Sequence, residues 1–129
     1  MHRKIVIFQN LIDMKYRIVD NVAVVTGLAE RIADAESAMD RVLSLKYESG
    51  VTAMAFSKDC FIEDFFRLSS GIAGEVIQKF VNYGIRAAVF GDFSQYTSKP
   101  LRDFIYESNK GCHFGFLDSE NDAVEWLNR

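Results

Sequence analysis

The chain has 129 residues, the length of one ordinary domain, so there is no room for a second independent core. Hydrophobic residues make up 49% and charged residues 26% of the sequence, which excludes the disordered, collagen-like and coiled-coil classes. With 15 Lys and Arg against 18 Asp and Glu, the net charge is -3. Because no general basic surface is available to hold a phosphate backbone, we expect no nucleic-acid partner.

Cys60 and Cys112 are the two cysteines, too few for a disulfide scaffold and without the spacing of a zinc site. We therefore expect a cytoplasmic location, with no metal and no cofactor. The basic residues 1–4 followed by the apolar residues 5–8 resemble the start of a signal peptide, but the apolar run ends at Gln9, so the pattern predicts a strand. No stretch is long and apolar enough to span a bilayer, and no membrane partner is expected.

The first predicted elements are a β-hairpin and a helix. Residues 16–19 and 22–25 are rich in β-formers and flank the turn pair Asp20 and Asn21. Asp34 can cap a helix over residues 34–48, which Gly50 ends. The apolar residues of this helix recur at helical spacing and are expected to face the core: Ala35, Ala38, Met39, Val42 and Leu43.

Three short apolar runs, residues 51–56, 85–90 and 112–117, are separated by helical patterns, as in a parallel sheet with crossover helices. The intervening helices begin after Gly71 and after Ser98, and Gly84 and Gly111 end them. Ser119 predicts the start of a terminal helix. The apolar positions of these three helices are Ile72, Ala73, Val76, Ile77, Phe80 and Val81; then Leu101, Phe104 and Ile105; then Ala123, Val124, Trp126 and Leu127. The predicted fold is one α/β domain over residues 1–129, a mixed sheet with an N-terminal hairpin and parallel strands.

The first candidate site is Ser69, Ser70 and Gly71, where the chain enters a helix. Free N–H groups and the helix dipole can hold an anion there, or a serine can be phosphorylated. The alternative is that one serine is simply the helix cap.

The second candidate is a set of carboxylates, Asp59, Asp92 and Asp118, each just beyond a predicted strand. Ligands of open α/β sheets bind outside the carboxyl ends of the strands, and converging carboxylates can hold Mg²⁺. However, Asp92 follows a glycine in a turn dipeptide and Asp118 lies where a cap is expected, which favours structural roles.

The third candidate is the connection from residue 91 into the following helix, with Asp92, Ser94, Lys99, Arg102 and Tyr106 as tentative ligand-binding residues. Connections of this length tend to be functional. Lys99 and Arg102 near a helix start can neutralise an anion, or they are simply a solvated face.

Catalytic chemistry has little support, and no catalytic residue is assigned. His113 is next to Cys112 in a predicted strand, where neighbouring side chains point to opposite faces and cannot pair. No GxGxxG, Walker loop, HExxH or GxSxG motif occurs. A crowded apolar segment, Phe61, Ile62, Phe65 and Phe66, indicates either a homodimer interface or a short helix folded onto the core.

Three strings carry a resemblance to a known family: residues 65–75, 78–83 and 101–109. Through them, and over residues 22–127, the chain resembles the bacterial family known as domain of unknown function 4180, which implies a small cytoplasmic protein without an assigned activity. Ser69, Ser70 and Gly71 are similar more loosely to the phosphorylatable Ser-Gly setting of the STAS fold of anti-sigma-factor antagonists. The insertion of residues 58–68 before the helix departs from the compact loop of that fold.

Two functional hypotheses follow. The first is a non-enzymatic regulatory or interaction domain of STAS-like type that presents the start of the 71–83 helix and the 91–98 loop to a protein partner or a small anion. The second is a small enzyme or nucleotide-binding protein that uses Asp92, Lys99, Arg102 and Tyr106. Both require residues 57–70 and 91–102 to lie together at one end of a parallel sheet.

Overall fold

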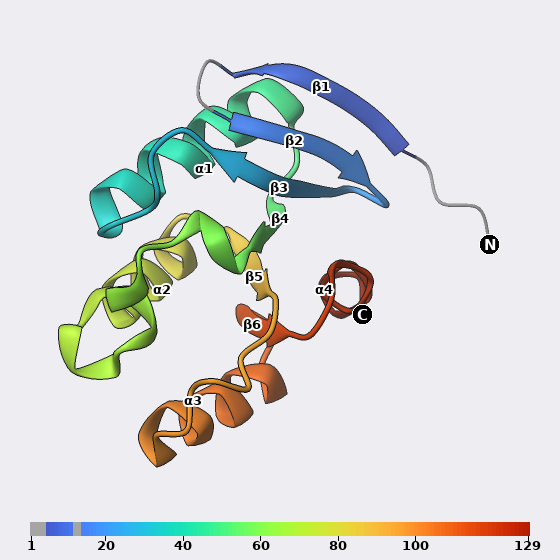
Figure 1. The fold of residues 1–129 in the computed structure, drawn as a ribbon. Helices are drawn as coiled ribbons and strands as arrows, with labels where there is room; N and C mark the ends of the chain where they lie inside the picture. Colours follow the sequence, from blue (N-terminus) through green and yellow to red (C-terminus); the bar gives the residue numbers. More distant parts are fainter. Residues whose placement is uncertain (1–4, 12–13) are drawn as a thin grey trace.

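The computed structural model describes residues 5–11 and 14–129. Within them lies one sheet of six strands, in the order β1-β2-β3-β4-β5-β6, together with four α-helices (Figure 1). The strands are β1 (Ile5–Leu11), β2 (Met14–Val19), β3 (Val22–Leu28), β4 (Ala53–Ser57), β5 (Arg86–Phe90) and β6 (Phe114–Leu117). The helices are α1 (Ala35–Ser49), α2 (Ile72–Asn82), α3 (Lys99–Lys110) and α4 (Glu120–Leu127). The mixed α/β fold is therefore confirmed.

The N-terminal half of the sheet is antiparallel. β1 pairs with β2, and β2 pairs with β3, through the predicted hairpin. Asp20 and Asn21 both have positive φ, 50° and 64°, as a type I′ turn requires, and short polar side chains tolerate this conformation. The strand expected at residues 5–8 is also present, as part of β1.

Strands β3, β4, β5 and β6 run parallel to one another. Right-handed crossovers between successive neighbouring strands place every connecting helix on the same face. Accordingly α1, α2 and α3 cover one face of the sheet and enclose the larger core, while α4 covers the other face (Figure 1). The carboxyl ends of β4, β5 and β6 therefore lie at the same end of the sheet, where the loops that follow these strands meet.

Local capping signals fix the ends of α1. The Asp34 carboxylate accepts the Ser37 N–H at 2.8 Å, and Gly50 ends the helix with a positive φ of 78°. One inner position was predicted wrongly: Leu43 is 42% exposed, whereas Leu45 is buried. Both leucines flank the apolar stripe, and the packing of the helix selects the side that holds Leu45.

The end of α2 is a Schellman motif. The Ile85 N–H donates to the Phe80 carbonyl at 2.8 Å, the Gly84 N–H donates to the Val81 carbonyl at 3.2 Å, and Gly84 has a positive φ of 70°. Phe80 and Ile85 are both buried, so the apolar contact that accompanies this motif is part of the core. Val81, expected on the inner arc, is instead exposed.

The outer edge of β6 is closed by side chains of α3. The Asn109 amide donates to the Phe116 carbonyl at 2.8 Å and its oxygen accepts the Phe116 N–H at 2.7 Å. The Ser108 hydroxyl donates to the Phe114 carbonyl. These bonds satisfy main-chain groups that an edge strand otherwise leaves open to another chain. Because β6 begins at Phe114, Cys112 and His113 precede the strand, and the prediction that they belong to it was wrong.

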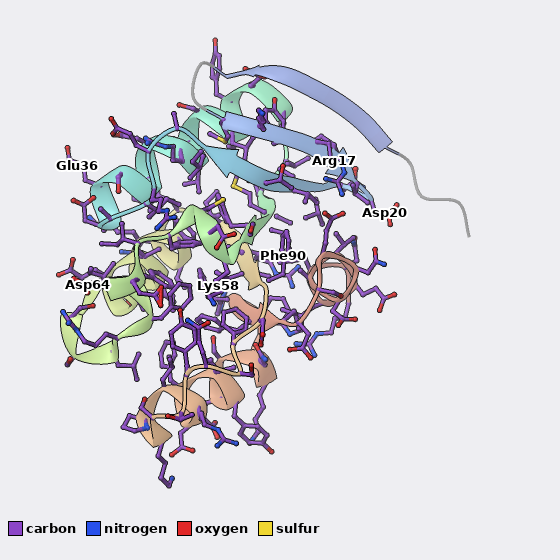
Figure 2. All side chains as sticks on the ribbon, in the orientation of Figure 1. Arg17, Asp20, Glu36, Lys58, Asp64 and Phe90 are labelled. Atoms are coloured by element: carbon purple, nitrogen blue, oxygen red, sulfur yellow. The ribbon has the colours of Figure 1, made fainter. Side chains whose placement is uncertain are left out.

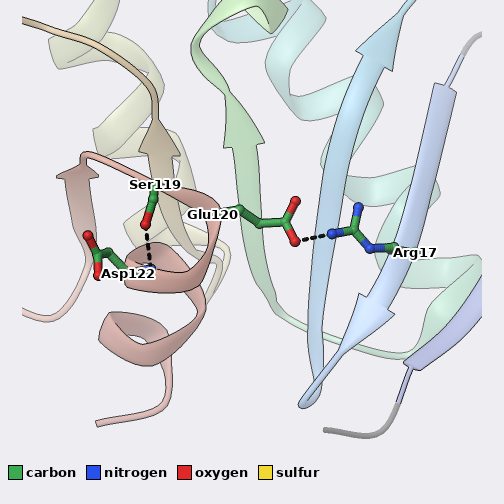
Figure 3. Close-up of polar contacts among 4 residues, drawn as sticks. All are labelled: Arg17, Ser119, Glu120 and Asp122. Carbon is green, nitrogen blue, oxygen red and sulfur yellow. Dashed lines mark hydrogen bonds and ion pairs between the residues drawn. The ribbon is translucent and has the colours of Figure 1, made fainter.

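Helix α4 is held against the hairpin at both ends. Arg17 of β2 forms an ion pair with Glu120 in the first turn of α4 (Figure 3). At the other end, the Asn128 amide donates to the Asp20 carbonyl of the hairpin turn at 3.1 Å. As predicted, Ser119 caps the helix by accepting the Asp122 N–H at 3.1 Å. The antiparallel and parallel halves of the sheet are thereby joined on this face.

Candidate functional site

Two connections meet at the carboxyl ends of the parallel strands. Residues 58–71 follow β4 and form three short 3₁₀ turns, and residues 91–98 join β5 to α3. Lys58 Nζ donates to the Asp92 carbonyl at 2.9 Å, and the Tyr96 hydroxyl donates to the Glu63 carboxylate at 2.5 Å. Lys58 lies at the start of the first connection, directly after β4 (Figure 2). The two stretches are therefore neighbours, as the sequence predicted. We call their solvent-facing side the strand-end surface.

Aromatic rings underlie this surface. The Phe66 ring stacks on Tyr96 with centroids 5.2 Å apart and planes at 22°, and it lies 5.9 Å from Phe93. Phe93 in turn packs edge-on against Phe116 of β6 at 5.8 Å. Such ring pairs add about 0.5 to 1.5 kcal/mol each beyond their buried area. The loops are consequently anchored to the main core through their rings.

A third connection, between β3 and α1, is tied to the same end. The Ile32 N–H donates to the Cys60 carbonyl at 2.8 Å, and the Ile62 N–H donates to the Ile32 carbonyl at 3.0 Å. Ile32 is completely buried. The segment after β4 is thus fixed on two sides, by residue 32 and by the loop after β5.

The titratable groups here have defined partners. Burial, followed by the hydrogen bond to Glu63, raises the pKa of Tyr96 above its ordinary value. Hydrogen bonds from Ser94, together with the charge of Lys58, hold the pKa of Asp92 below its usual range. Burial raises the pKa of the Cys60 thiol to about 12, so this thiol stays protonated at neutral pH and is a poor nucleophile.

Ser70 has a structural role in this structure. Its hydroxyl donates to the Asp64 carbonyl at 2.7 Å and accepts the Ile72 N–H at 3.2 Å. The formal cap of α2 is Gly71, which has a positive φ of 78°. Ser69, by contrast, is exposed. In this first candidate site, the Ser70 hydroxyl therefore pairs with a free N–H of the first turn of α2, although Ser70 stands one residue before the N-cap, Gly71.

The third candidate site is divided between two places. Asp92 and Ser94 lie on the strand-end surface, joined by a 2.9 Å bond from the Ser94 N–H to the Asp92 carboxylate. Lys99, Arg102 and Tyr106 are exposed on α3, beyond its Ser98 cap. Lys99 is paired with Asp103 at 2.6 Å, and Tyr106 is 64% exposed beside the ammonium of Lys110. The basic pair therefore lies on an exposed face of α3.

The carboxylates of the second candidate do not converge. Among residues 5–11 and 14–129, no three His, Cys, Asp or Glu side chains are close enough to hold a metal ion together. The convergence of Asp59, Asp92 and Asp118 on which the Mg²⁺ alternative depends is therefore not found in this part of the chain. Asp92 is instead the acceptor of a local turn.

The apolar segment after β4 is folded onto the core. Phe61, Phe65 and Phe66 are at most 4% exposed, and Ile62 is half-buried. Phe61 and Phe65 have ring centroids 4.4 Å apart. The second of the two interpretations of this segment is the one observed, and the surface that suggested a homodimer is not on the outside of the molecule.

Sequence reasoning missed the residues that join the two loops: Lys58, Glu63 and Tyr96. Lys58 directly follows a predicted strand, a position that could have marked it as a candidate site residue. Its hydrogen-bond partner Asp92, however, is 34 residues away in the sequence. Glu63 stands in a segment that reads as apolar because of its phenylalanines. Their pairing depends on how that segment turns, which no local pattern encodes.

Comparison with known protein families shows which family the chain belongs to. The family model described as domain of unknown function DUF4180 matches residues 19–127. The chain belongs to the DUF4180 family. This confirms the resemblance carried by residues 65–75, 78–83 and 101–109, and the match spans β3 through α4. No curated protein and no solved structure matches the DUF4180 chain, so the STAS resemblance gains no support from them.

Proposed function

We propose that this DUF4180 protein is a non-enzymatic interaction module that presents its strand-end surface to a protein partner. The observation that carries the proposal is the joining of the two loops by the 2.5 Å bond between Tyr96 and Glu63 and by the stacking of Phe66 on Tyr96. A surface whose loops are already ordered loses little conformational entropy on binding, which favours affinity. We place the protein in the bacterial cytoplasm, where its two free cysteines stay reduced.

Charge favours this proposal over an anion- or nucleotide-binding role. Among the residues of the two loops, the acidic ones are Asp59, Glu63, Asp64 and Asp92, and the basic ones are Lys58 and Arg67. Four carboxylates against two cations leave a net charge of -2, which repels phosphate groups. None of the helices in the described part of the chain is long and apolar enough to cross a membrane.

The test is site-specific photo-crosslinking in the cells that make the protein. A benzophenone side chain replaces Ser94, which is exposed on the strand-end surface, and in a matched variant it replaces Glu125, exposed on α4. The proposal predicts one discrete crosslinked protein from position 94 and none from position 125. The purified partner must then bind Ser94→Arg at least about tenfold more weakly than Glu125→Arg, a loss of roughly 1.4 kcal/mol.

Equal crosslinking at both positions, or none at Ser94, would refute the interaction surface. A nucleotide or Mg²⁺ that raises the melting temperature would favour the alternative role, because a ligand that binds the folded state stabilises it. Ser70→Asp is a poor probe of regulation here. The new carboxylate would face the Asp64 carbonyl, to which the serine hydroxyl now donates, so the change disturbs the fold.

A further inference from the structure

The ammonium of Lys58 occupies a seat made of two rings and a carbonyl oxygen. Nζ lies 4.9 Å from the centroid of Tyr96 and 6.0 Å from that of Phe93, and it donates to the Asp92 carbonyl at 2.9 Å. No carboxylate of the described residues is within ion-pair distance of this nitrogen. Aromatic faces with one acceptor are the chemistry of cation recognition rather than that of an ordinary surface ion pair.

The surroundings of the seat favour a positive charge. The Glu63 carboxylate accepts the Tyr96 hydroxyl, and the Asp92 carboxylate accepts the Ser94 N–H, so both negative charges are held close to the rings. Without the charge of Lys58, the loop residues carry the four carboxylates named above against Arg67, a net charge of -3. A seat emptied of its lysine would therefore attract a cation.

Only the head of Lys58 has to move for the seat to open. Its Cβ, Cγ and Cδ lie over Gly91, where an added Cβ would stand 2.8 Å from Lys58 Cβ and 3.3 Å from Lys58 Cδ. The rest of the stem has rotatable bonds, and the residue is half-buried at the surface. A lysine head moved into water recovers its hydration, so rotation of the side chain is sufficient to open the seat.

We propose that this seat is a recognition site for the alkylammonium group of a lysine on the partner, and that Lys58 fills it in the free protein. The inference rests on the proposed interaction function and specifies the partner's chemistry: a basic segment whose lysine displaces the internal one. Lys58 is then an autoinhibitory group that a ligand of the wrong charge does not remove. The two rings and the Asp92 carbonyl supply the selectivity, and the carboxylates supply the attraction.

The test is chemical rescue of the full chain carrying Lys58→Ala. n-Butylammonium chloride, which has the shape and charge of the deleted group, is compared at 100 mM with sodium chloride and with n-butanol. The matched variant is Lys99→Ala, which removes a lysine whose partner is Asp103 on α3, outside the seat. Readouts are the melting temperature and the backbone amide shifts of residues 91–96.

The expected result is a rise of about 2 °C or more in the melting temperature of Lys58→Ala with butylammonium beyond either control solute, as ligand linkage requires. The amide shifts concentrate in residues 91–96, and a further Tyr96→Leu change abolishes both effects. No excess rise, or an equal rise in Lys99→Ala, overturns the proposal. If Lys58→Ala does not fold alone, Lys58→Gln takes its place, with the same two outcomes. Because no partner is present, a failed rescue rejects the cation seat alone, whereas failed crosslinking at Ser94 rejects the interaction surface.

Discussion

Replacement of Asn109 by alanine should destabilise the protein by opening the edge of β6. The change removes the two hydrogen bonds to Phe116, worth about 1 kcal/mol each, and leaves a partly buried N–H and C=O poorly solvated for about 1 kcal/mol more. Alanine gains roughly 0.5 kcal/mol in helix propensity. The expected loss in the free energy of unfolding is therefore about 2 to 3 kcal/mol, or about 6 to 12 °C in melting temperature for a domain of this size.

Urea unfolding followed by circular dichroism measures this loss. The midpoint should fall while the slope m stays unchanged, because the surface exposed on unfolding is the same. The matched control is Asn82→Ala, at the end of α2, where the side chain accepts only one exposed hydrogen bond, from Gln78. The control should change stability by less than about 0.5 kcal/mol. If both variants unfold at the same urea concentration, the edge-closing role of Asn109 is wrong.

Three further changes test other parts of the structure. Burial, and then a hydrogen bond to a carboxylate, raise the pKa of Tyr16 above its usual value, so the folded state keeps a proton that the unfolded state releases above about pH 10. The free energy of unfolding therefore falls as the pH rises beyond that point, and Tyr16→Phe should make this fall less steep in denaturation curves recorded from pH 9 to 12. An equally steep fall in the variant would contradict the buried, hydrogen-bonded state of Tyr16. A thiol-specific reagent at pH 8 should modify one cysteine per native chain, because Cys112 is exposed whereas burial raises the pKa of Cys60 to about 12. The Cys112→Ser variant should have no reactive thiol until denaturant is added. A second fast-reacting thiol in the native protein would contradict the burial of Cys60. A double-mutant cycle on Arg17 and Glu120 should give a coupling of about 1 kcal/mol that declines with added salt; a coupling of zero at low salt would mean that the pair does not join β2 to α4.

The boundaries of most elements were predictable because their signals are local. Asp34 and Gly50 bracket α1, Asp20 and Asn21 specify the hairpin turn, and Ser119 starts α4, each through a bond or a dihedral angle that involves neighbouring residues. The parallel strands were predictable from short apolar runs, since both faces of the sheet are covered.

What the sequence did not reveal depends on contacts between distant residues. Leu43 and Leu45 are the same residue type, one on each side of the apolar stripe of α1, and only the position of the helix on the sheet decides which of them is buried. The joining of Lys58 to Asp92 and of Glu63 to Tyr96 spans 34 and 33 positions. The shared end of the strands placed these loops together in advance, but the individual partners follow from the 3₁₀ turns between β4 and α2, whose course is set by the burial of Phe61, Phe65 and Phe66.

The closure of β6 by Asn109 also limits how copies of this sheet can be joined. In the described part of the chain the outer side of β1 has no strand partner, while α3 side chains block the opposite edge. Strand-to-strand contact between two molecules then has to use the same edge on both, which gives a two-fold symmetric pair with no free edge left. A sheet with two open edges would allow molecule after molecule to add, so the side chains of Asn109 and Ser108 separate a self-limiting contact from fibre growth.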